Sequence, residues 1–292
     1  MLWFYLVLAA TILWGIGNVF TKFVLDKHIK NPVFYLLFIA LFLTPFYIIF
    51  LLLFNPPILS YFFLLAIVSG FFFYVSAFLL YKAYTVEEVS RITPLAYTEV
   101  IFVLILSTIF LGETFTVEKY MGIFLIVIGA FLISYKRGLR LRRGAIFVLI
   151  SSFLFGVYVV LSKYTLNYIN FFDFYLGLLL GFSFTQVPIF VKYRITFFNV
   201  IRNLRKKIFV LLIIFGLLNT LTTLFLYLPA LSLGPATLVS AVDATRPFFV
   251  LLFVSILSLF FPQILKEEMS KKSIALKIFA STLILLGVFL VG

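Results

Sequence analysis

The stretch SRITPLAYTEVIFVLILSTIFLGET, residues 90–114, decides the fold class of this chain. Its apolar run is long enough for one helix of about 20 residues to cross roughly 30 Å of hydrocarbon. Glu99 lies inside the run, where a charged side chain costs about 2.5–3.5 kcal/mol and usually faces the bundle interior or a water-filled cavity. The segment therefore predicts a transmembrane helix that carries a functional or ion-paired carboxylate.

The composition of the whole chain agrees with this segment. Hydrophobic residues make up 64% of the 292 residues and charged residues 11%, whereas a soluble domain is about half apolar and a quarter charged. The apolar runs do not alternate in polarity as membrane β-strands do. The sequence therefore predicts an all-α membrane protein. Its ten transmembrane helices are expected at 2–21, 33–54, 58–81, 92–111, 118–135, 145–163, 171–191, 208–228, 236–260 and 274–291.

Basic residues are distributed unevenly between the connections of these spans. The formal net charge is +13, yet 20 of the 23 Lys and Arg residues lie on alternate connections. The basic groups are at 22–30, 82–91, 136–143, 192–207 and 266–277. The positive-inside rule places such connections in the cytoplasm, so we expect a multi-pass plasma-membrane protein with both termini outside. The pattern argues against a nucleic-acid partner.

One basic segment, KYRITFFNVIRNLRKK at 192–207, also contains several apolar side chains. Such a segment can lie along the anionic leaflet as a short interfacial helix. A solvated loop is the alternative reading. The expected partners are therefore a small-molecule substrate and the bilayer, with anionic lipid at 192–207 left open.

The sequence offers few groups for catalysis. It contains no cysteine and a single histidine, His28, in a charged connection, so neither a disulfide nor a metal cluster is expected. The HExxH and G-x-S-x-G motifs of metalloproteases and serine hydrolases are absent. We therefore expect no cofactor and no enzymatic activity. A membrane-embedded enzyme remains the minor alternative.

Two pairs of segments indicate an internal duplication. LIVIGAFLIS (125–134) closes the fifth predicted span and LILLGVFLVG (283–292) closes the tenth; WGIGNVFTK (14–22) corresponds to FGVYVVLSK (155–163). Offsets of about 146–148 positions for the spans between them fit duplicated halves with different loop lengths. The predicted parts are a first five-helix repeat (1–135), a basic connecting loop (136–144) and a second five-helix repeat (145–292).

The number of spans in each repeat has a geometric consequence. Because five is odd, the second repeat starts on the opposite face of the bilayer from the first. The two halves are then inverted repeats, related by a pseudo-two-fold axis in the membrane plane. Such repeats underlie alternating access in transporters.

Several short motifs resemble those of a known family. Ten spans in two halves, WG at 14–15, LGET at 111–114 and ATRPFFVLLFVSILSLFF at 244–261 resemble the drug/metabolite transporter (DMT) superfamily, and within it the EamA-like exporters. The resemblance implies a helical secondary transporter for metabolite export. The LGET turn has no counterpart in the second half, where LFFPQ stands at 259–263.

Three ionisable residues at bilayer depth form the centre of the predicted substrate site. They are Glu99 in the fourth span, and Asp243 and Arg246 on one face of the ninth. The repeat offset overlays Glu99 on Arg246, so we expect them at matching depths across a central cavity. In one hypothesis Glu99 binds a substrate ammonium and Arg246 a carboxylate. In a second, Glu99 carries a proton; in a third, the three residues form only a structural ion-pair network.

Weaker polar candidates lie in the neighbouring spans. In lipid, such groups also bond across helices or to their own backbone. The candidates are Asn18, Tyr81, Tyr158, and a stripe at helical spacing formed by Asn219, Thr222, Thr223 and Tyr227. Gly177 and Gly181 form a GLLLG pattern that serves either packing within the chain or a dimer face. A monomer is expected, with a homodimer left open.

These patterns together predict a secondary transporter, an exporter or exchanger of a small polar or zwitterionic metabolite such as an amino acid. Transport by alternating access through a cavity between the repeats is the expected mechanism. The main alternative within the same superfamily is a flippase of a lipid-linked carrier, which requires a lateral opening to the bilayer.

Overall fold

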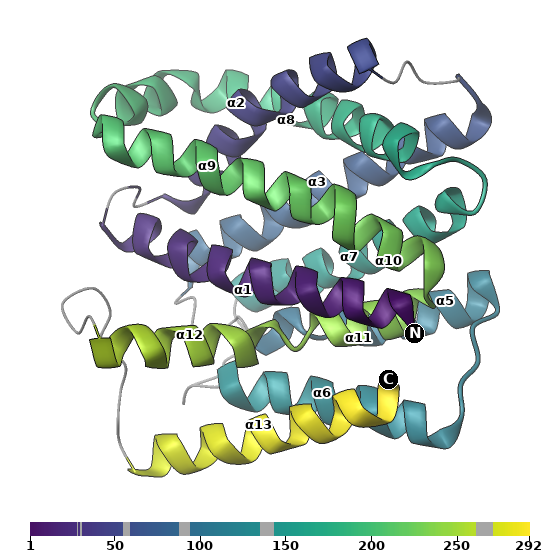
Figure 1. The fold of residues 1–292 in the computed structure, drawn as a ribbon. Helices are drawn as coiled ribbons and strands as arrows, with labels where there is room; N and C mark the ends of the chain where they lie inside the picture. Colours follow the sequence, from purple (N-terminus) through teal and green to yellow (C-terminus); the bar gives the residue numbers. More distant parts are fainter. Residues whose placement is uncertain (28, 30, 55–58, 88–93, 135–142, 261–270) are drawn as a thin grey trace.

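The computed structural model describes the chain apart from residues 28, 30, 55–58, 88–93, 135–142 and 261–270. Within the described part every regular element is a helix (Figure 1). The helices are α1 (Leu2–Lys27), α2 (Pro32–Phe54), α3 (Tyr61–Val86), α5 (Glu99–Leu111), α6 (Val117–Ser134), α7 (Arg143–Leu166), α8 (Phe171–Arg202), α9 (Lys206–Thr222), the π-helix η1 (Thr223–Tyr227), α10 (Leu228–Leu233), α11 (Ala236–Asp243), α12 (Arg246–Phe260) and α13 (Lys271–Val291).

The prediction of an all-helical membrane protein is confirmed. Seven helical segments among the described residues are long and apolar enough to cross a bilayer, and α13 contains a shorter apolar helix. Each of the ten predicted spans overlaps a helix. The count of ten membrane crossings stays a prediction, and both His28 and most of the connecting loop 136–144 lie outside the described residues.

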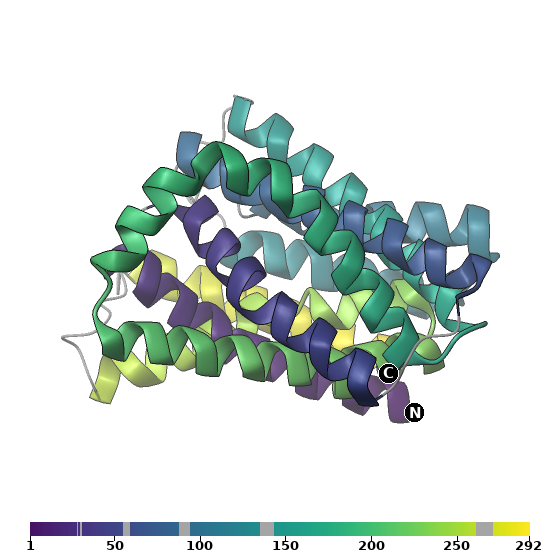
Figure 2. The same ribbon diagram turned by 90° about the horizontal axis from the view of Figure 1, so that it is seen from above.

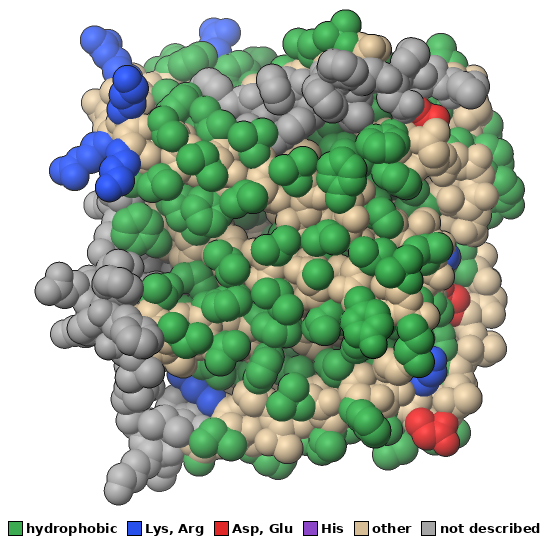
Figure 3. Space-filling model, viewed as in Figure 1, with side chains coloured by type: hydrophobic (Ala, Val, Ile, Leu, Met, Phe, Trp, Pro, Cys, Tyr) green, Lys and Arg blue, Asp and Glu red, His purple; other side chains and the backbone are tan. Residues whose placement is uncertain are grey.

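The surface of the molecule matches a bilayer environment. Large apolar side chains such as Leu53 (73% exposed) and Phe289 (82% exposed) cover the sides of the helices. In Figure 3 hydrophobic side chains (green) fill the middle of the visible face, while Lys and Arg side chains (blue) gather at the upper left. The α8–α9 turn lies at that end, opposite both termini (Figure 1). Exposed apolar sides between charged ends are what a membrane-spanning bundle requires.

The segment 192–207 differs from its predicted form. No separate interfacial helix is present, because α8 continues without interruption to Arg202 and α9 begins at Lys206. All six basic side chains of the segment are exposed. Ile195 and Phe198 are also exposed, by 72% and 57%. The basic and apolar groups therefore share the protruding end of one long helix.

Glycine residues set the closest contacts between helices. A Cβ added to Gly177 would lie 2.6 Å from Ala66 Cβ, and one added to Gly181 would overlap the carbonyl oxygen of Ile67 in α3. The GLLLG pattern therefore serves packing of α8 on α3 within the chain. The α6–α13 contact is similar, since a Cβ on Gly122 would lie 2.8 Å from the Gly287 carbonyl oxygen. Backbones can approach this closely only where side chains are small.

The helices of the two halves pack in a reciprocal pattern. In the first half α3 and α5 pack on α7; in the second, the corresponding α9–α10 and α11–α12 pack on α1. The corresponding α6 and α13 lie side by side (Figure 1), and α2 lies between α8 and α9 (Figure 2). If each helix is replaced by its counterpart in the other half, the contacts named above are replaced by one another. This reciprocity supports the predicted inverted repeat, whose exact boundaries stay a prediction.

Candidate substrate site

The fourth predicted span contains a tightened turn just before Glu99. Residues 94–96 form a short helical turn, Tyr97 and Thr98 form a turn, and α5 begins at Glu99. The Thr98 hydroxyl donates to the Leu95 carbonyl oxygen at 2.6 Å, and such a side-chain bond competes with the backbone ladder of a helix. The backbone stays right-handed helical through Thr98, and residues 94–111 form one apolar helical segment, so Glu99 follows a tightened turn within that segment.

The ninth predicted span contains a similar tightened turn within one continuous helical segment. α11 ends at Asp243 and α12 begins at Arg246. The Thr245 hydroxyl donates to the Val242 carbonyl oxygen at 2.7 Å. Pro247 has no N–H to continue the ladder to the carbonyl of Asp243. Thr245 and Arg246 follow Val242 as Thr98 and Glu99 follow Leu95 in the first half, so the two tightened turns occupy equivalent positions of the repeat.

A third irregularity interrupts the eighth predicted span. Residues Thr223–Tyr227 form the π-helix η1 between α9 and α10, and the Leu228 N–H bonds to the Thr223 carbonyl oxygen. Pro229 follows directly and cannot donate a backbone hydrogen bond. Short π-helical turns are frequent at functional sites. Tyr227, the last residue of η1, is 3% exposed and turned into the molecule.

Polar side chains near these three irregular turns lie close together, and we call this group the central cluster. It consists of Trp14, Glu99, Tyr158, Tyr227, Asp243 and Arg246. Arg246 forms an ion pair with Asp243 and lies over the Trp14 ring, 4.7 Å from its centroid. The ring centroids of Trp14 and Tyr227 are 5.1 Å apart. A guanidinium held between a carboxylate and an indole is strongly oriented.

Glu99 belongs to this cluster but makes no ion pair with another described residue. It lies within electrostatic range of Asp243 and Arg246, is partly exposed, and forms no side-chain hydrogen bond with any described residue. Because Asp243 already compensates Arg246, an ionised Glu99 has no counterion of its own among the described residues. A buried or half-buried charge of this kind needs a counterion, a proton or a ligand.

Several polar atoms of the cluster are buried without a hydrogen-bond partner. They are Trp14 Nε1, Tyr227 Oη and Arg246 Nε, joined by Ser240 Oγ one turn before Asp243. These statements hold for the described part of the chain. Buried polar groups are paired in the great majority of cases. Trp14 Nε1 and Arg246 Nε are pure donors and therefore lack an acceptor, and the two hydroxyls can also donate to one.

The remaining predicted site residues have different positions. Tyr158 is buried and lies within electrostatic range of Asp243. Tyr81 is partly buried and lies within electrostatic range of Arg246. Asn18 and Asn219 are exposed, and the structure does not bring them into the cluster. The Thr223 hydroxyl bonds back to the Asn219 carbonyl oxygen at 2.9 Å. Thr222 is buried within α9. The π-helix changes the helical register after Thr222, so the predicted stripe does not continue to Tyr227.

Trp14 is the cluster residue that the sequence analysis missed. The WG pair at 14–15 was read only as a feature of the resemblance to a family. An indole inside an apolar span carries no charge, so it does not stand out in a search for ionisable residues. Its position over Arg246 follows only from the packing of α1 on α11 and α12.

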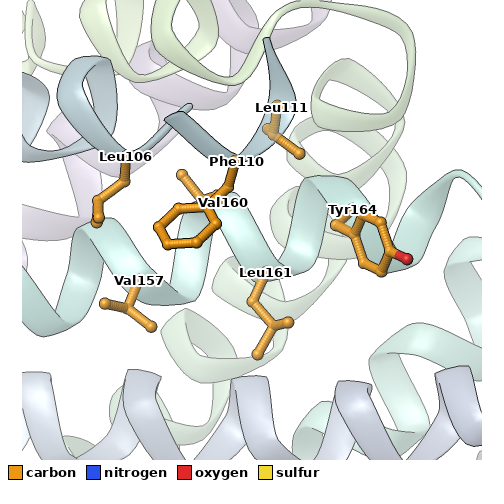
Figure 4. Close-up of a pocket in the computed structure, with 7 residues that line it drawn as sticks. All are labelled: Leu106, Phe110, Leu111, Val157, Val160, Leu161 and Tyr164. Atoms are coloured by element: carbon orange, nitrogen blue, oxygen red, sulfur yellow. The ribbon is translucent and has the colours of Figure 1, made fainter. Parts of the chain in front are cut away.

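A separate apolar groove lies on the side of the molecule between α5 and α7 (Figure 4). Its volume is about 320 Å³, and Tyr164 is the one lining residue with a polar side chain. No lining residue belongs to the central cluster or to the predicted site. At Gly156 the two helices close on each other, because a Cβ added there would lie 3.1 Å from Phe102 Cβ. The chemistry of the groove suits lipid contact, not a polar substrate.

The fold and the cluster define a class: a multi-pass helical membrane protein whose helices have irregular turns around a polar centre. Residues 1–135 match the EamA-like transporter family, and this match places the chain in the drug/metabolite transporter superfamily, which consists of transporters. The stated resemblance to that superfamily is thereby confirmed.

Comparison with solved structures agrees with this assignment at the level of the fold. One crystal structure of a protein aligns with 99% of this chain and 94% of its own, with a TM-score of 0.73 and 12% sequence identity. At that identity the likeness shows the fold alone. Comparison with curated proteins gives no match.

Proposed function

We propose that this membrane transporter is a secondary transporter that exports or exchanges a small zwitterionic metabolite, such as an amino acid, by alternating access. One observation carries the proposal. Glu99 of the first half and Arg246 of the second half follow the tightened turns of two spans at equivalent positions and lie within electrostatic range of each other. Transporters built from inverted repeats bind their substrates near the bilayer midplane at the interface between the repeats.

The charges of the central cluster favour a substrate with an ammonium group. Glu99 is the acidic residue of the cluster that has no hydrogen-bonded partner among the described residues, so its ionised form needs a cation beside it. A substrate ammonium beside Glu99 neutralises it. In the empty carrier a proton on Glu99 does the same, so exchange of substrate for proton is a consistent route for coupling.

The buried donors of the cluster favour a carboxylate at the other end of the substrate. Trp14 Nε1, Tyr227 Oη and Arg246 Nε have no acceptor in the described part of the chain. A carboxylate accepts several hydrogen bonds at once, and a guanidinium suits it better than an ammonium does. Since these donors are fully buried, their side chains must move when the substrate enters.

The proposal is tested by transport into proteoliposomes with a matched substrate series. The series is a neutral amino acid, its methyl ester and its deaminated acid, each with and without a pH gradient. We expect transport of the amino acid at least about tenfold faster than of either analogue, because loss of one charged partner costs more than about 1.4 kcal/mol. Equal transport of the amino acid and of its methyl ester contradicts the carboxylate subsite, and with it the proposal.

The flippase alternative makes a different demand on the structure. A lipid-linked substrate needs a lateral route from the bilayer to the centre. The apolar groove between α5 and α7 faces the side of the molecule, yet the helices close behind it at Gly156. This packing favours a soluble metabolite as substrate. A scrambling assay with a fluorescent lipid-linked sugar in the same proteoliposomes tests the alternative directly.

The membrane orientation and the lipid partner belong to the same proposal. The exposed basic side chains at 192–207 lie at the end of the molecule opposite both termini (Figures 1 and 3). With this end cytoplasmic, the basic groups face the anionic leaflet, and Ile195 and Phe198 reach its apolar boundary. We therefore place both termini outside a plasma membrane. Binding to vesicles with and without phosphatidylserine tests the lipid contact.

A further inference from the structure

A second acidic residue joins the two halves at the end of the molecule that carries the termini. Glu113 belongs to the LGET turn after α5, and its carboxylate accepts hydrogen bonds from the Ala236 N–H at 2.5 Å, the Thr237 N–H at 3.1 Å and the Thr237 hydroxyl at 2.8 Å. Ala236 and Thr237 are the first residues of α11. A carboxylate from the first half therefore caps a helix of the second half, where the helix dipole favours it.

The position of Glu113 is fixed by its own turn. Gly112 ends α5 in the left-handed conformation with φ 69°, and its N–H bonds to the Ser107 carbonyl oxygen. A non-glycine residue is strained at such a φ. The Ser107 hydroxyl lies 2.5 Å from that of Thr237. The turn thus aims the carboxylate at α11, and a second bond between the halves lies beside it.

The chain leading into α11 is held on its other sides as well. Lys163 of α7 donates to the Ser232 carbonyl oxygen at 2.8 Å and lies within electrostatic range of Glu113. A Cβ added to Gly234 would lie 2.7 Å from the Trp3 ring of α1. The α10–α11 connection is therefore enclosed by α1, α7 and the turn after α5.

This contact has a direct relation to the central cluster. α11 runs from the Glu113 carboxylate at its start to Asp243 at its end. A movement of α11 therefore changes the Glu113 contact at its start and the cluster at its end together. At the corresponding place in the second half the sequence reads LFFPQ (259–263), without an acidic residue.

We infer that the Glu113 carboxylate, bound to the N-terminus of α11, is the gate contact that keeps the terminal end of the transport path closed. The inference rests on the proposed alternating-access function. Opening at this end requires Glu113 to part from Ala236 and Thr237. The contact therefore stabilises closure at the end of the molecule that carries the termini and biases the carrier toward the state open at the basic end.

The chain has no native cysteine, so distances between introduced labels can be measured without background. Spin labels at Val117→Cys and Leu233→Cys lie on exposed positions (71% and 58%) on either side of the contact. Double electron–electron resonance then reports the separation of the α5–α6 turn from the α10–α11 connection. The labelled Glu113→Gln protein is compared with labelled wild type. The matched control is Glu118→Gln, which removes the same charge from an exposed side chain in the first turn of α6.

We expect a single short distance for wild type and for Glu118→Gln, and a second, longer distance for Glu113→Gln. The ratio of open to closed molecules should rise on the order of tenfold, as expected for loss of one charge-assisted hydrogen bond. If Glu113→Gln does not fold, Thr237→Val removes the hydroxyl bonds alone and should give a smaller rise. A lower Tm with an unchanged distance distribution identifies a purely structural cap and overturns the inference.

The measurement separates the gate contact from the proposed function. An opened end in Glu113→Gln together with no metabolite transport by wild type contradicts the proposed function and leaves the contact itself supported. Transport by wild type with unchanged distances in Glu113→Gln contradicts only the gate contact.

Discussion

The glycine contacts and the central cluster represent opposite ways of joining helices in one bilayer. At the contacts of α8 with α3 and of α6 with α13, backbones touch through Gly181, Gly122 and Gly287 with no room for a Cβ. At the cluster the helices have irregular turns. Charged side chains lie beside these turns, together with buried polar atoms that have no hydrogen-bond partner among the described residues. The first arrangement is apolar and complete; the second is polar and lacks partners.

We infer from this difference that the glycine contacts stabilise the fold and that the central cluster rearranges during transport. A contact between glycine backbones is stabilised by close packing that any displacement weakens. A polar cluster with buried atoms that lack partners among the described residues can be rearranged by a ligand that supplies those partners. Substitutions at the glycines should therefore affect folding, and substitutions in the cluster should affect transport with the fold intact.

The largest effect is expected at Gly181. In Gly181→Ala the new methyl group would overlap the Ile67 carbonyl oxygen, and overpacking of this kind costs about 3 kcal/mol or more. We expect loss of monodisperse protein in size-exclusion chromatography and a strongly reduced Tm. Gly17→Ala is the matched control, because nothing lies within 4 Å of its added Cβ and a helical alanine stabilises by about 1 kcal/mol. An equal Tm for the two variants would contradict the close α3–α8 contact.

The next largest effect is expected at Glu99. Glu99→Gln keeps the shape of the side chain but removes its negative charge. We expect transport of the amino acid to fall by about 100-fold, a loss typical of a buried charge pair, with Tm unchanged. Glu118→Gln, on the exposed start of α6, should transport normally. Full activity of Glu99→Gln removes Glu99 from the mechanism.

A smaller effect is expected at Arg246. Arg246→Lys keeps the positive charge beside Asp243 but loses the planar guanidinium over Trp14. Since a lysine neither stacks as well nor donates in a fork, we expect transport to fall by about tenfold. Proteoliposome uptake measures it, with the surface substitution Lys119→Arg as control. Transport at the wild-type rate would show that charge alone matters at this position.

The smallest effect is expected at the two threonines of the tightened turns. Thr98→Val and Thr245→Val each remove one hydroxyl bond to a carbonyl three residues earlier, worth about 1 kcal/mol. We expect each to change the transport rate by about two- to fivefold, and by similar amounts because the positions are equivalent in the repeat. A large effect at one threonine and none at the other would contradict that equivalence.

Much of the central cluster could be predicted from the sequence. Glu99, Asp243 and Arg246 stand out because ionisable residues are costly within apolar spans, and the repeat aligns Glu99 with Arg246. Trp14 could not be found in this way, since an indole in an apolar helix has no such cost. Asn18 and Asn219 were chosen for polarity alone, and the packing leaves both exposed.

The sequence by itself determined that this chain crosses a membrane as a helical bundle, because hydrophobicity is a local property that adds up along each span. It also determined which end carries the basic side chains and which residues bear an unusual charge. The tertiary structure decided where the helices have irregular turns, that GLLLG packs on α3, and that Glu113 caps α11. These features depend on hydrogen bonds and close contacts between residues far apart in the chain, and no local pattern encodes which partners meet.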